Sequence, residues 1–373
     1  MKNDYIAIRR YLHQHPELSF EEYNSAKTIS DVLNSLSIPH STGIAKTGVC
    51  GVLRGKYPGK TILLRADMDA LPLQEKNQCE YASQNNGVMH ACGHDVHVAV
   101  ILMAAELLSE RIDDIHGNVK FVFQPAEETT GGALPMIKEG ILKNPDVSAC
   151  IGLHVKPELE TGKIIASSGK IMASPDSFYI TLSGKGGHCA TPSQNDDLLS
   201  ALAVLLTELK CISYPDSLVV PCEVHAGTAP NIMPSELKIS GSFRSFDPGV
   251  RQKIAQNICN LVEKISKSFG IQGETEIELL YPPLCNDTHL TATLQKVAET
   301  VIGTDNVIKT FTPSFLGEDF SYFGESVPAS YFYLGCKRND RETALHADNF
   351  DVDESAIEIG AKIIAETVLE YLK

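Results

Sequence analysis

Three apolar runs of strand length each end in polar side chains. They are TILLRADMD (residues 61–69), NVKFVFQPAEE (118–128) and VSACIGLHV (147–155). Helical patterns separate the runs, which indicates a mostly parallel sheet covered by helices. Because open α/β sheets place their ligand sites beyond the carboxyl ends of parallel strands, we expect the three ends to meet at one edge.

A second pattern begins near residue 174. DSFYITLSGKGGH (176–188) alternates apolar and polar residues, as a half-exposed antiparallel strand does. A helix over 195–213, two strands, a helix over 248–269 and a last strand follow. This β-α-β-β-α-β order predicts a small ferredoxin-like α+β domain.

The α/β pattern then returns with a helix over 288–303, the strand SYFYLGC and a helix over 353–372. We therefore predict a discontinuous main domain of residues 1–173 and 285–373, into which a domain of residues 174–284 is inserted.

The amino-terminal segment, residues 4–36, has a helical pattern. Within it, Ser19 and Glu22 have the spacing of a capping box, in which a serine and a glutamate three residues later satisfy the first amides of a helix. We expect a helix to begin there.

Composition limits the classes of partner. The 373 residues carry a net charge of −15, so the chain gains no electrostatic attraction to nucleic acid or anionic lipid. No signal peptide and no run of about 18 apolar residues is present, and we expect a cytoplasmic protein. The ten cysteines show no CxxC spacing, and in a reducing compartment we expect most of them to be small core residues, with Cys92 set apart because it alone lies among histidines.

The stretch MHACGHDVH (89–97) places three histidines, a cysteine and an aspartate before an apolar helix. Metal binding, thiol redox chemistry and surface polarity are the alternatives. Redox chemistry needs a resolving thiol, and the nearest cysteine in sequence, Cys79, has no motif linking it to Cys92. Metal binding is the better interpretation.

Further side chains that can bind a metal are Glu128 and His154 at the strand ends and His346 in the loop before Phe350. Thiolate, imidazole and carboxylate are the ligands of zinc and related metals, and five donors suit a two-metal catalytic centre with one bridging ligand. A cation also relieves the repulsion between the adjacent Glu127 and Glu128. The candidate ligands are Cys92, His94, Glu128, His154 and His346.

Other polar residues lie near these donors. Asp67 and Asp69 either orient ligating imidazoles or form a strand-end turn, and we expect His90 and His97 to lie outside the set of ligands. In the inserted domain, a convergence of His188, Asn231 and Arg244 would supply an oxyanion donor and a carboxylate clamp. Polarity of a half-exposed sheet explains these three equally well.

Nine motifs in order resemble the N-acyl-amino-acid amidohydrolases of the aminoacylase/carboxypeptidase metallopeptidase superfamily, the branch with hippurate hydrolase and the auxin-conjugate hydrolases. The chain departs from many peptidases of the superfamily, because Asp67-Met68-Asp69 stands where they have His-x-Asp and Cys92 where they have a bridging aspartate. The motifs are RRYLHQHPELSFEE, RADMDALPL, MHACGHDVH, FQPAEE, GLHV, GKGGHCATP, GTAPNIMP, FLGEDFSYF and LHADNFDVDE.

The resemblance implies two divalent metals, zinc or manganese first and cobalt or nickel as alternatives, held by the five donors with Cys92 bridging. It implies Glu127 as general base and His188 as oxyanion donor, reaching a partner subunit's site. Asn231 and Arg244 would hold the substrate carboxylate, and the inserted domain would be a lid and dimerisation domain. The expected substrate is an N-acyl amino acid.

Three alternatives stay open at this point. An N-acetyldiaminopimelate deacetylase or a dipeptidase would use the same metal site with a different pocket. A non-catalytic binding protein would keep the fold, although the presence of every expected donor disfavours it.

Overall fold

The computed structural model describes residues 3–373 and divides them into two compact units. The larger unit comprises residues 3–171, 285–312 and 319–373, and the smaller comprises 172–284 and 313–318. Residues 313–318, which were predicted to belong to the main domain, are grouped with the smaller unit in the structure.

Contacts within the smaller unit explain this assignment. The amide of Ala173 donates to the carbonyls of Ser314 and Leu316, at 3.1 and 3.0 Å. The ring of Phe315 packs on that of Phe246, with centroids 5.1 Å apart.

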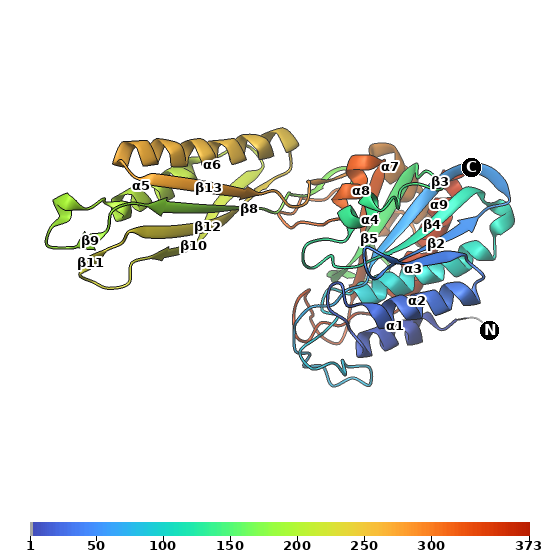
Figure 1. The fold of residues 1–373 in the computed structure, drawn as a ribbon. Coiled ribbons are helices and arrows are strands. Elements are labelled where there is room, and N and C mark those ends of the chain that lie inside the picture. Colours follow the sequence, from blue (N-terminus) through green and yellow to red (C-terminus); the bar gives the residue numbers. More distant parts are fainter. Residues whose placement is uncertain (1–2) are drawn as a thin grey trace. The chain divides into compact units, whose positions relative to one another are not determined.

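The larger unit is built on an eight-stranded sheet (Figure 1). Its central strands run parallel, as predicted, while the ladders at both sides include antiparallel pairs. In sheet order the strands are β1 (His40–Ile44), β2 (Gly48–Arg54), β4 (His116–Gln124), β3 (Tyr57–Asp67), β5 (Ala149–Glu160), β16 (Ala329–Lys337), β6 (Ile164–Ile165) and β15 (Val307–Ile308).

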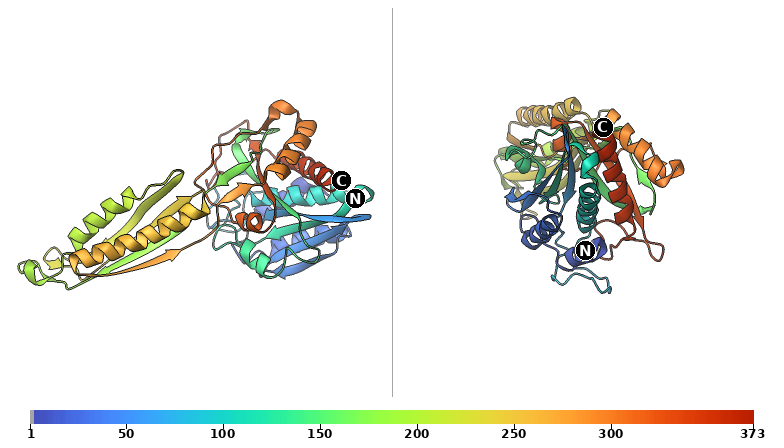
Figure 2. Two further views of the ribbon diagram at one scale, coloured as in Figure 1. Left: turned by 90° about the horizontal axis from the view of Figure 1, so that it is seen from above. Right: turned by 90° about the vertical axis from the view of Figure 1, so that its right-hand side faces the viewer.

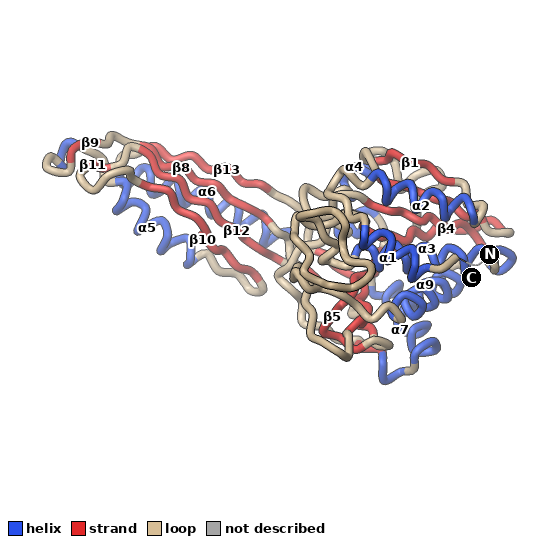
Figure 3. Tube along the Cα trace, turned by 90° about the horizontal axis from the view of Figure 1, so that it is seen from below, coloured by secondary structure: helices blue, strands red, loops and turns tan. Residues whose placement is uncertain are grey.

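The register of the parallel strands brings the polar strand ends to one edge, as the sequence predicts. Gln124 of β4 lies beside Asp67 of β3, and Arg65 of β3 lies beside Gly152 of β5, two residues before His154. Loops, drawn in tan in Figure 3, gather at one end of these strands.

Helices flank this sheet, and most of them share one apolar core with it. The bounds are α1 (Tyr5–Gln14), α2 (Tyr23–Ser35), α3 (His94–Ser109), α4 (Ala133–Lys138), α7 (Thr288–Ile302), α8 (Ser321–Ser326) and α9 (Ala356–Tyr371), with 3₁₀ turns η1 (Ile112–Asp114) and η3 (Thr304–Asn306). Helix α3 is almost entirely buried, since it packs between α1, α9 and the sheet.

The smaller unit has the predicted β-α-β-β-α-β order. Its four-stranded antiparallel sheet has the order β10-β12-β8-β13, and α5 and α6 cover one face (Figures 1 and 2). The elements are β8 (Asp176–Ser183), α5 (Leu198–Cys211), β10 (Ser217–Ala226), β12 (Glu236–Ser245), α6 (Pro248–Phe269) and β13 (Gln272–Glu278), with η2 (Pro192–Gln194) and the short pair β9 (Gly187–His188) with β11 (Ile232–Met233). A further short pair, β7 (Gly169–Met172) with β14 (Leu284–Asn286), belongs mostly to the larger unit.

The predicted capping box is wrong. The segment is not one helix, because α1 ends at Gln14 and α2 begins only at Tyr23. Ser19 makes no cap bond to α2, and its hydroxyl donates to Asp69 at 2.7 Å. Glu22 is the residue before α2, but its carboxylate bonds to residues outside that helix. Both side chains form hydrogen bonds with residues that are distant in the sequence instead of capping the helix.

Within residues 3–373, no helix combines the length and the apolar character needed to cross a membrane.

Candidate metal centre

The five predicted donors come together in the larger unit. Cys92 lies in the loop before α3, His94 is the first residue of α3, and His154 lies in β5. Glu128 follows β4, and His346 follows β16. Ligand atoms lie within 4.8 Å of one another in three overlapping sets, namely Cys92–His94–His154, Cys92–Glu128–His346 and His94–Glu127–Glu128.

The overlap of the sets has a chemical consequence. Cys92 belongs to one set with two imidazoles and to another with a carboxylate and an imidazole. Its sulfur lies 3.3 Å from Nε2 of His154. One thiolate shared between two donor sets is the arrangement in which a sulfur can bridge two cations.

Unusual backbone conformations direct these side chains. Gly93, between Cys92 and His94, has φ 86° and precedes the first turn of α3. A side chain at residue 93 would meet Cγ2 of Val155 at 2.4 Å, so only glycine fits. Ala126 (φ 57°) and His346 (φ 60°) also adopt the left-handed conformation, which costs free energy in a residue with a Cβ.

Two ligand imidazoles have their ring orientation fixed by the backbone. Nδ1 of His94 lies 2.9 Å from the carbonyl of Asp69, and Nδ1 of His154 lies 2.7 Å from that of Val155. A carbonyl accepts only, so Nδ1 carries a proton in both rings. Nε2 of each ring is then the atom that faces the cluster.

The polar atoms at the centre of the cluster fit a cation. Nε2 of His94 and Oε1 of Glu128 are buried and have no hydrogen-bond partner among residues 3–373. They lie 3.8 Å apart, and Nε2 of His346 lies 3.4 Å from the same Glu128 oxygen. Buried polar atoms without partners cost free energy unless something else satisfies them, and a metal ion would satisfy both.

The protonation states agree with this fit. Burial opposes the ionisation of Glu128, but His346 and His94 outweigh it and lower the pKa of this carboxyl to about 2. Burial lowers the pKa of His154 to about 3, so its ring is neutral. Burial raises the pKa of the Cys92 thiol, so a cation that binds there displaces a proton.

His97 forms a further set with Asp67 and His94, but both of its ring nitrogens are hydrogen-bonded within the described residues. Nδ1 of His97 lies 2.5 Å from Oδ1 of Asp67, and its Nε2 accepts the amide of Val155 at 2.9 Å. Both ring nitrogens of His90 lack partners within the described residues, but its ligand atoms belong to none of the three sets. Burial lowers the pKa of His90 to about 4.

Asp69 organises the turn that carries the two glutamates. Its Oδ1 accepts the amide of Glu127 and its Oδ2 accepts that of Glu128, each at 3.1 Å. The carboxylate of Asp67 has other partners. It accepts hydrogen bonds from His97 and from Nη1 of Arg65, the latter at 2.6 Å. Of the two aspartates, Asp69 is the one bonded to a candidate ligand, His94.

A buried polar network behind the site was missed from the sequence. Nη2 of Arg65 donates to Asp319 at 2.7 Å, and Nε donates to Gln124 at 2.9 Å. Asp319 also accepts the amide of Ala133 at 3.0 Å, near the start of α4. An arginine inside an apolar strand needs a buried anion, and that was the signal available in TILLRAD.

The three candidates in the smaller unit do not converge within one chain. His188 and Ile232 pair across β9 and β11, so His188 and Asn231 lie at one end of the unit. Arg244 lies on β12 eight residues from Glu236, which is roughly 26 Å of extended strand toward the other end. A common site for all three would need more than one copy of the chain.

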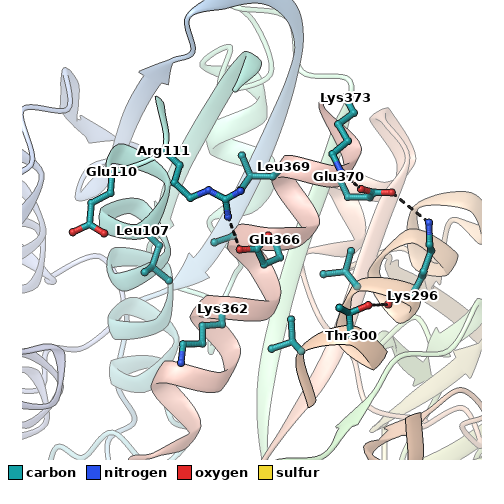
Figure 4. A pocket seen from close by; sticks show the side chains of 13 residues that line it. Leu107, Glu110, Arg111, Lys296, Thr300, Lys362, Glu366, Leu369, Glu370 and Lys373 are labelled. Atoms are coloured by element: carbon teal, nitrogen blue, oxygen red, sulfur yellow. Dashed lines mark hydrogen bonds and ion pairs between the residues drawn. The ribbon is translucent and has the colours of Figure 1, made fainter. Parts of the chain in front are cut away.

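A groove of about 590 Å³ lies elsewhere on the larger unit, between α3, α7 and α9 (Figure 4). Leu107, Val301 and Leu369 form apolar parts of its lining. Its charges are paired with each other, since Arg111 binds Glu366 and Lys296 binds Glu370. None of the candidate ligands lines it, so the groove is separate from the metal centre.

Residues 63–370 match the sequence model of Peptidase family M20/M25/M40. The chain belongs to this family. The motif-based assignment is thereby confirmed, and the chain is a hydrolase.

The similar proteins include an amidohydrolase and peptidases. The N-acyl-L-amino acid amidohydrolase of Geobacillus stearothermophilus is 42% identical over 77% of this chain and 79% of its own length. Thermostable carboxypeptidase 1 of Saccharolobus solfataricus is 37% identical over 95% of this chain and 92% of its own. The crystal structure of a dinuclear metal binding peptidase from the M20 family of Bacillus subtilis is 33% identical, with a TM-score of 0.89, and covers 99% of this chain and 97% of that one.

Proposed function

We propose that the chain hydrolyses the amide bond of N-acyl amino acids and releases a carboxylic acid and a free amino acid. The observation that carries the proposal is the convergence of five metal-binding side chains beside Glu127. The similarity to an N-acyl-L-amino acid amidohydrolase supports the substrate class.

Two divalent cations would be held by Cys92, His94, Glu128, His154 and His346, with Cys92 shared. Bound there, they supply Lewis acidity and lower the pKa of a water molecule. The mixed sulfur, nitrogen and oxygen donors suit zinc or manganese, and also cobalt or nickel.

Glu127 acts as the general base in this proposal. Its amide is tied to Asp69, while its carboxylate belongs to the set with His94 and Glu128. The carboxylate takes a proton from the attacking water and returns it to the leaving amine. The same group therefore serves both proton transfers.

His188 is suited to stabilise the oxyanion. Its Nδ1 accepts the amide of Ala190 at 3.0 Å, so Nδ1 is unprotonated and Nε2 carries the hydrogen. The side chain is exposed, which leaves this N–H available to a substrate oxygen. Asn231 and Arg244 are proposed to hold the substrate carboxylate, and because they lie toward opposite ends of the smaller unit, this role also requires more than one copy of the chain.

A homodimer through the smaller unit accompanies this proposal. His188 and Arg244 lie at opposite ends of that unit, so roles for both in one site require more than one copy of the chain. The ten free cysteines suit a reducing compartment, and we place the enzyme in the cytoplasm.

Release of a carboxyl-terminal amino acid from peptides is the second candidate, because of the similarity to a thermostable carboxypeptidase. Both reactions liberate an amino acid whose carboxylate must be held. A single assay separates them, because the acyl part is a simple acid in one case and a peptide in the other.

The test is amino-acid release from acetyl, benzoyl, long-chain acyl and indole-acetyl amino acids, N-acetyldiaminopimelate and dipeptides. The protein is stripped with a chelator and reloaded with zinc or manganese. Metal-dependent release from an N-acyl amino acid supports the proposal, and release from dipeptides alone favours the second candidate. Full metal loading without release from any substrate contradicts both.

A further inference from the structure

The segment LSFEE (residues 18–22) belongs to a motif that the proposed function leaves unexplained. Glu22 accepts an amide of the loop that carries Glu127 and Glu128, and Ser19 donates to Asp69, which accepts two further amides of that loop. We propose that Glu22 is a positioning residue, which fixes this loop by accepting the amide of Ala126. The inference rests on the proposed function, because it assigns Glu22 an effect on the base and on the ligand Glu128.

Glu22 is entirely buried at the amino end of α2. Its Oε1 accepts the amide of Ala126 at 3.0 Å, and its Oε2 accepts the hydroxyl of Thr47 at 2.5 Å. Each carboxylate oxygen therefore has a donor of its own. The contact joins residues 104 positions apart, so it serves the tertiary arrangement and not the local helix.

Ala126 is the residue at which this contact matters most. It is fully buried and has φ 57°, in the left-handed region that costs an alanine roughly 1–2 kcal/mol. Pro125 before it has no amide hydrogen and fixes its own φ. The conformation of Ala126 decides in which direction the chain delivers the next two residues.

Three consecutive amides are held by two buried carboxylates. Ala126 donates to Glu22, and Glu127 and Glu128 donate to Asp69. Ser19, from the same segment as Glu22, donates to Asp69 at 2.7 Å. The LSFEE segment thus restrains the turn directly through Glu22 and indirectly through Ser19.

The contact does not need a charged acceptor. Burial raises the pKa of Glu22, and the nearby Asp69 adds to this effect. A protonated carboxyl or an amide keeps one carbonyl oxygen that can accept from Ala126. A glutamine at position 22 should therefore keep the hydrogen bond to the Ala126 amide, whereas an aliphatic side chain would leave that amide buried and unpaired.

A matched contact lies outside the metal centre. Oε2 of Glu139 accepts the amide of Ala45 at 3.0 Å, and Ala45 is also left-handed, with φ 48°. Ala45 lies in the turn between β1 and β2, and neither Ala45 nor Glu139 belongs to the metal-binding sets. Glu139→Leu removes the same kind of bond without touching the loop of Glu127.

The experiment compares the full-length variants Glu22→Leu, Glu22→Gln and Glu139→Leu. Zinc affinity is measured by competition with a chelator, together with kcat, KM and the melting temperature. We expect Glu22→Leu to weaken zinc binding about 10- to 100-fold and to lower kcat more than it changes KM. Glu22→Gln should stay within about threefold of wild type, and Glu139→Leu should change only the melting temperature.

Zinc affinity and kcat of Glu22→Leu within twofold of wild type would overturn the proposal, as would equal losses in Glu139→Leu. If Glu22→Leu does not fold, Thr47→Val tests the same contact, because it removes the donor that orients the carboxylate. Zinc affinity should then fall several-fold, and an unchanged affinity counts against the proposal. A wild type that hydrolyses no substrate refutes the proposed function, while the zinc measurement still tests Glu22.

Discussion

Glu127 is the residue on which turnover depends in the proposed mechanism. Glu127→Gln keeps the shape of the side chain and removes its ability to take a proton. We expect kcat to fall by at least about 100-fold while metal content stays unchanged. Steady-state kinetics and metal analysis of the same sample measure both quantities, and near wild-type turnover would refute the assignment of the base.

His13 predicts a pH-dependent contribution to stability. Its Nδ1 lies 2.8 Å from Asp95 and its Nε2 lies 3.3 Å from Glu75, while Arg9 is 3.3 Å from Nδ1. Burial and Arg9 lower the pKa of the imidazole, but the two carboxylates outweigh them and raise it above 6.5. The charged ring stabilises the fold fully below pH 6.5, and this contribution is lost as pH rises through the raised pKa.

The measurement is urea unfolding of wild type and His13→Gln across the pH range 5.5–9. We expect the difference in free energy of unfolding to be larger at pH 6 than at pH 9. A difference that is constant over this range would show that His13 does not change its charge between the folded and unfolded states.

The convergence of the five candidate donors was predictable, because few arrangements other than a metal site bring these residue types together. Cys92 and His94 stand out in the sequence itself, and Glu128 and His154 follow apolar runs. Ser19 and Glu22 were misread for the opposite reason. Their spacing matches a local capping pattern, whereas their true partners, Asp69 and Ala126, lie 50 and 104 residues away.

At the scale of elements, the turn into α3 is the most constrained connection. Gly93 has φ 86°, and a Cβ there would meet Val155, which is β-branched and stiff, at 2.4 Å. Gly140 after α4 has a similar φ of 88° but open space around it. We expect Gly93→Ala to cost about 3 kcal/mol or more and Gly140→Ala about 1 kcal/mol.

Thermal melting of both variants checks this difference. Zinc affinity should also fall in Gly93→Ala, because the residue lies between two candidate ligands. Equal effects of the two substitutions would mean that the loop before α3 can shift away from Val155 at little cost.

Long elements were predictable and short ones were not. The helix predicted over 248–269 is α6 (Pro248–Phe269), whose proline start and glycine end are strong signals. Strands of two residues, such as β6 and β15, carry no periodicity that a sequence pattern could reveal. Their place depends on neighbouring strands that come from distant parts of the chain.

At the scale of the whole molecule, each unit has its own apolar core. All five candidate metal ligands lie in the larger unit, so metal should stabilise that unit. A free metal concentration of 100 times Kd contributes about 2.7 kcal/mol. We expect a chelator to lower the melting transition of the larger unit and to leave that of the smaller unit unchanged.

Calorimetry with and without chelator, and again after zinc is restored, measures this effect. Substituting both Cys92 and His154 with alanine should abolish the response to chelator. A chelator that shifts every transition equally would show that the two units unfold together.

The positions of the candidate ligands along the chain also determine the order in which they are made during translation. Roughly 250 residues separate Cys92 from His346, which at about 5–20 residues per second is roughly 13–50 s of translation. During this interval the ribosome-bound chain already has its thiol, yet it lacks the last imidazole of the centre. In the proposed centre, a cation that bound Cys92 before His346 was made would therefore lack one of the five donors.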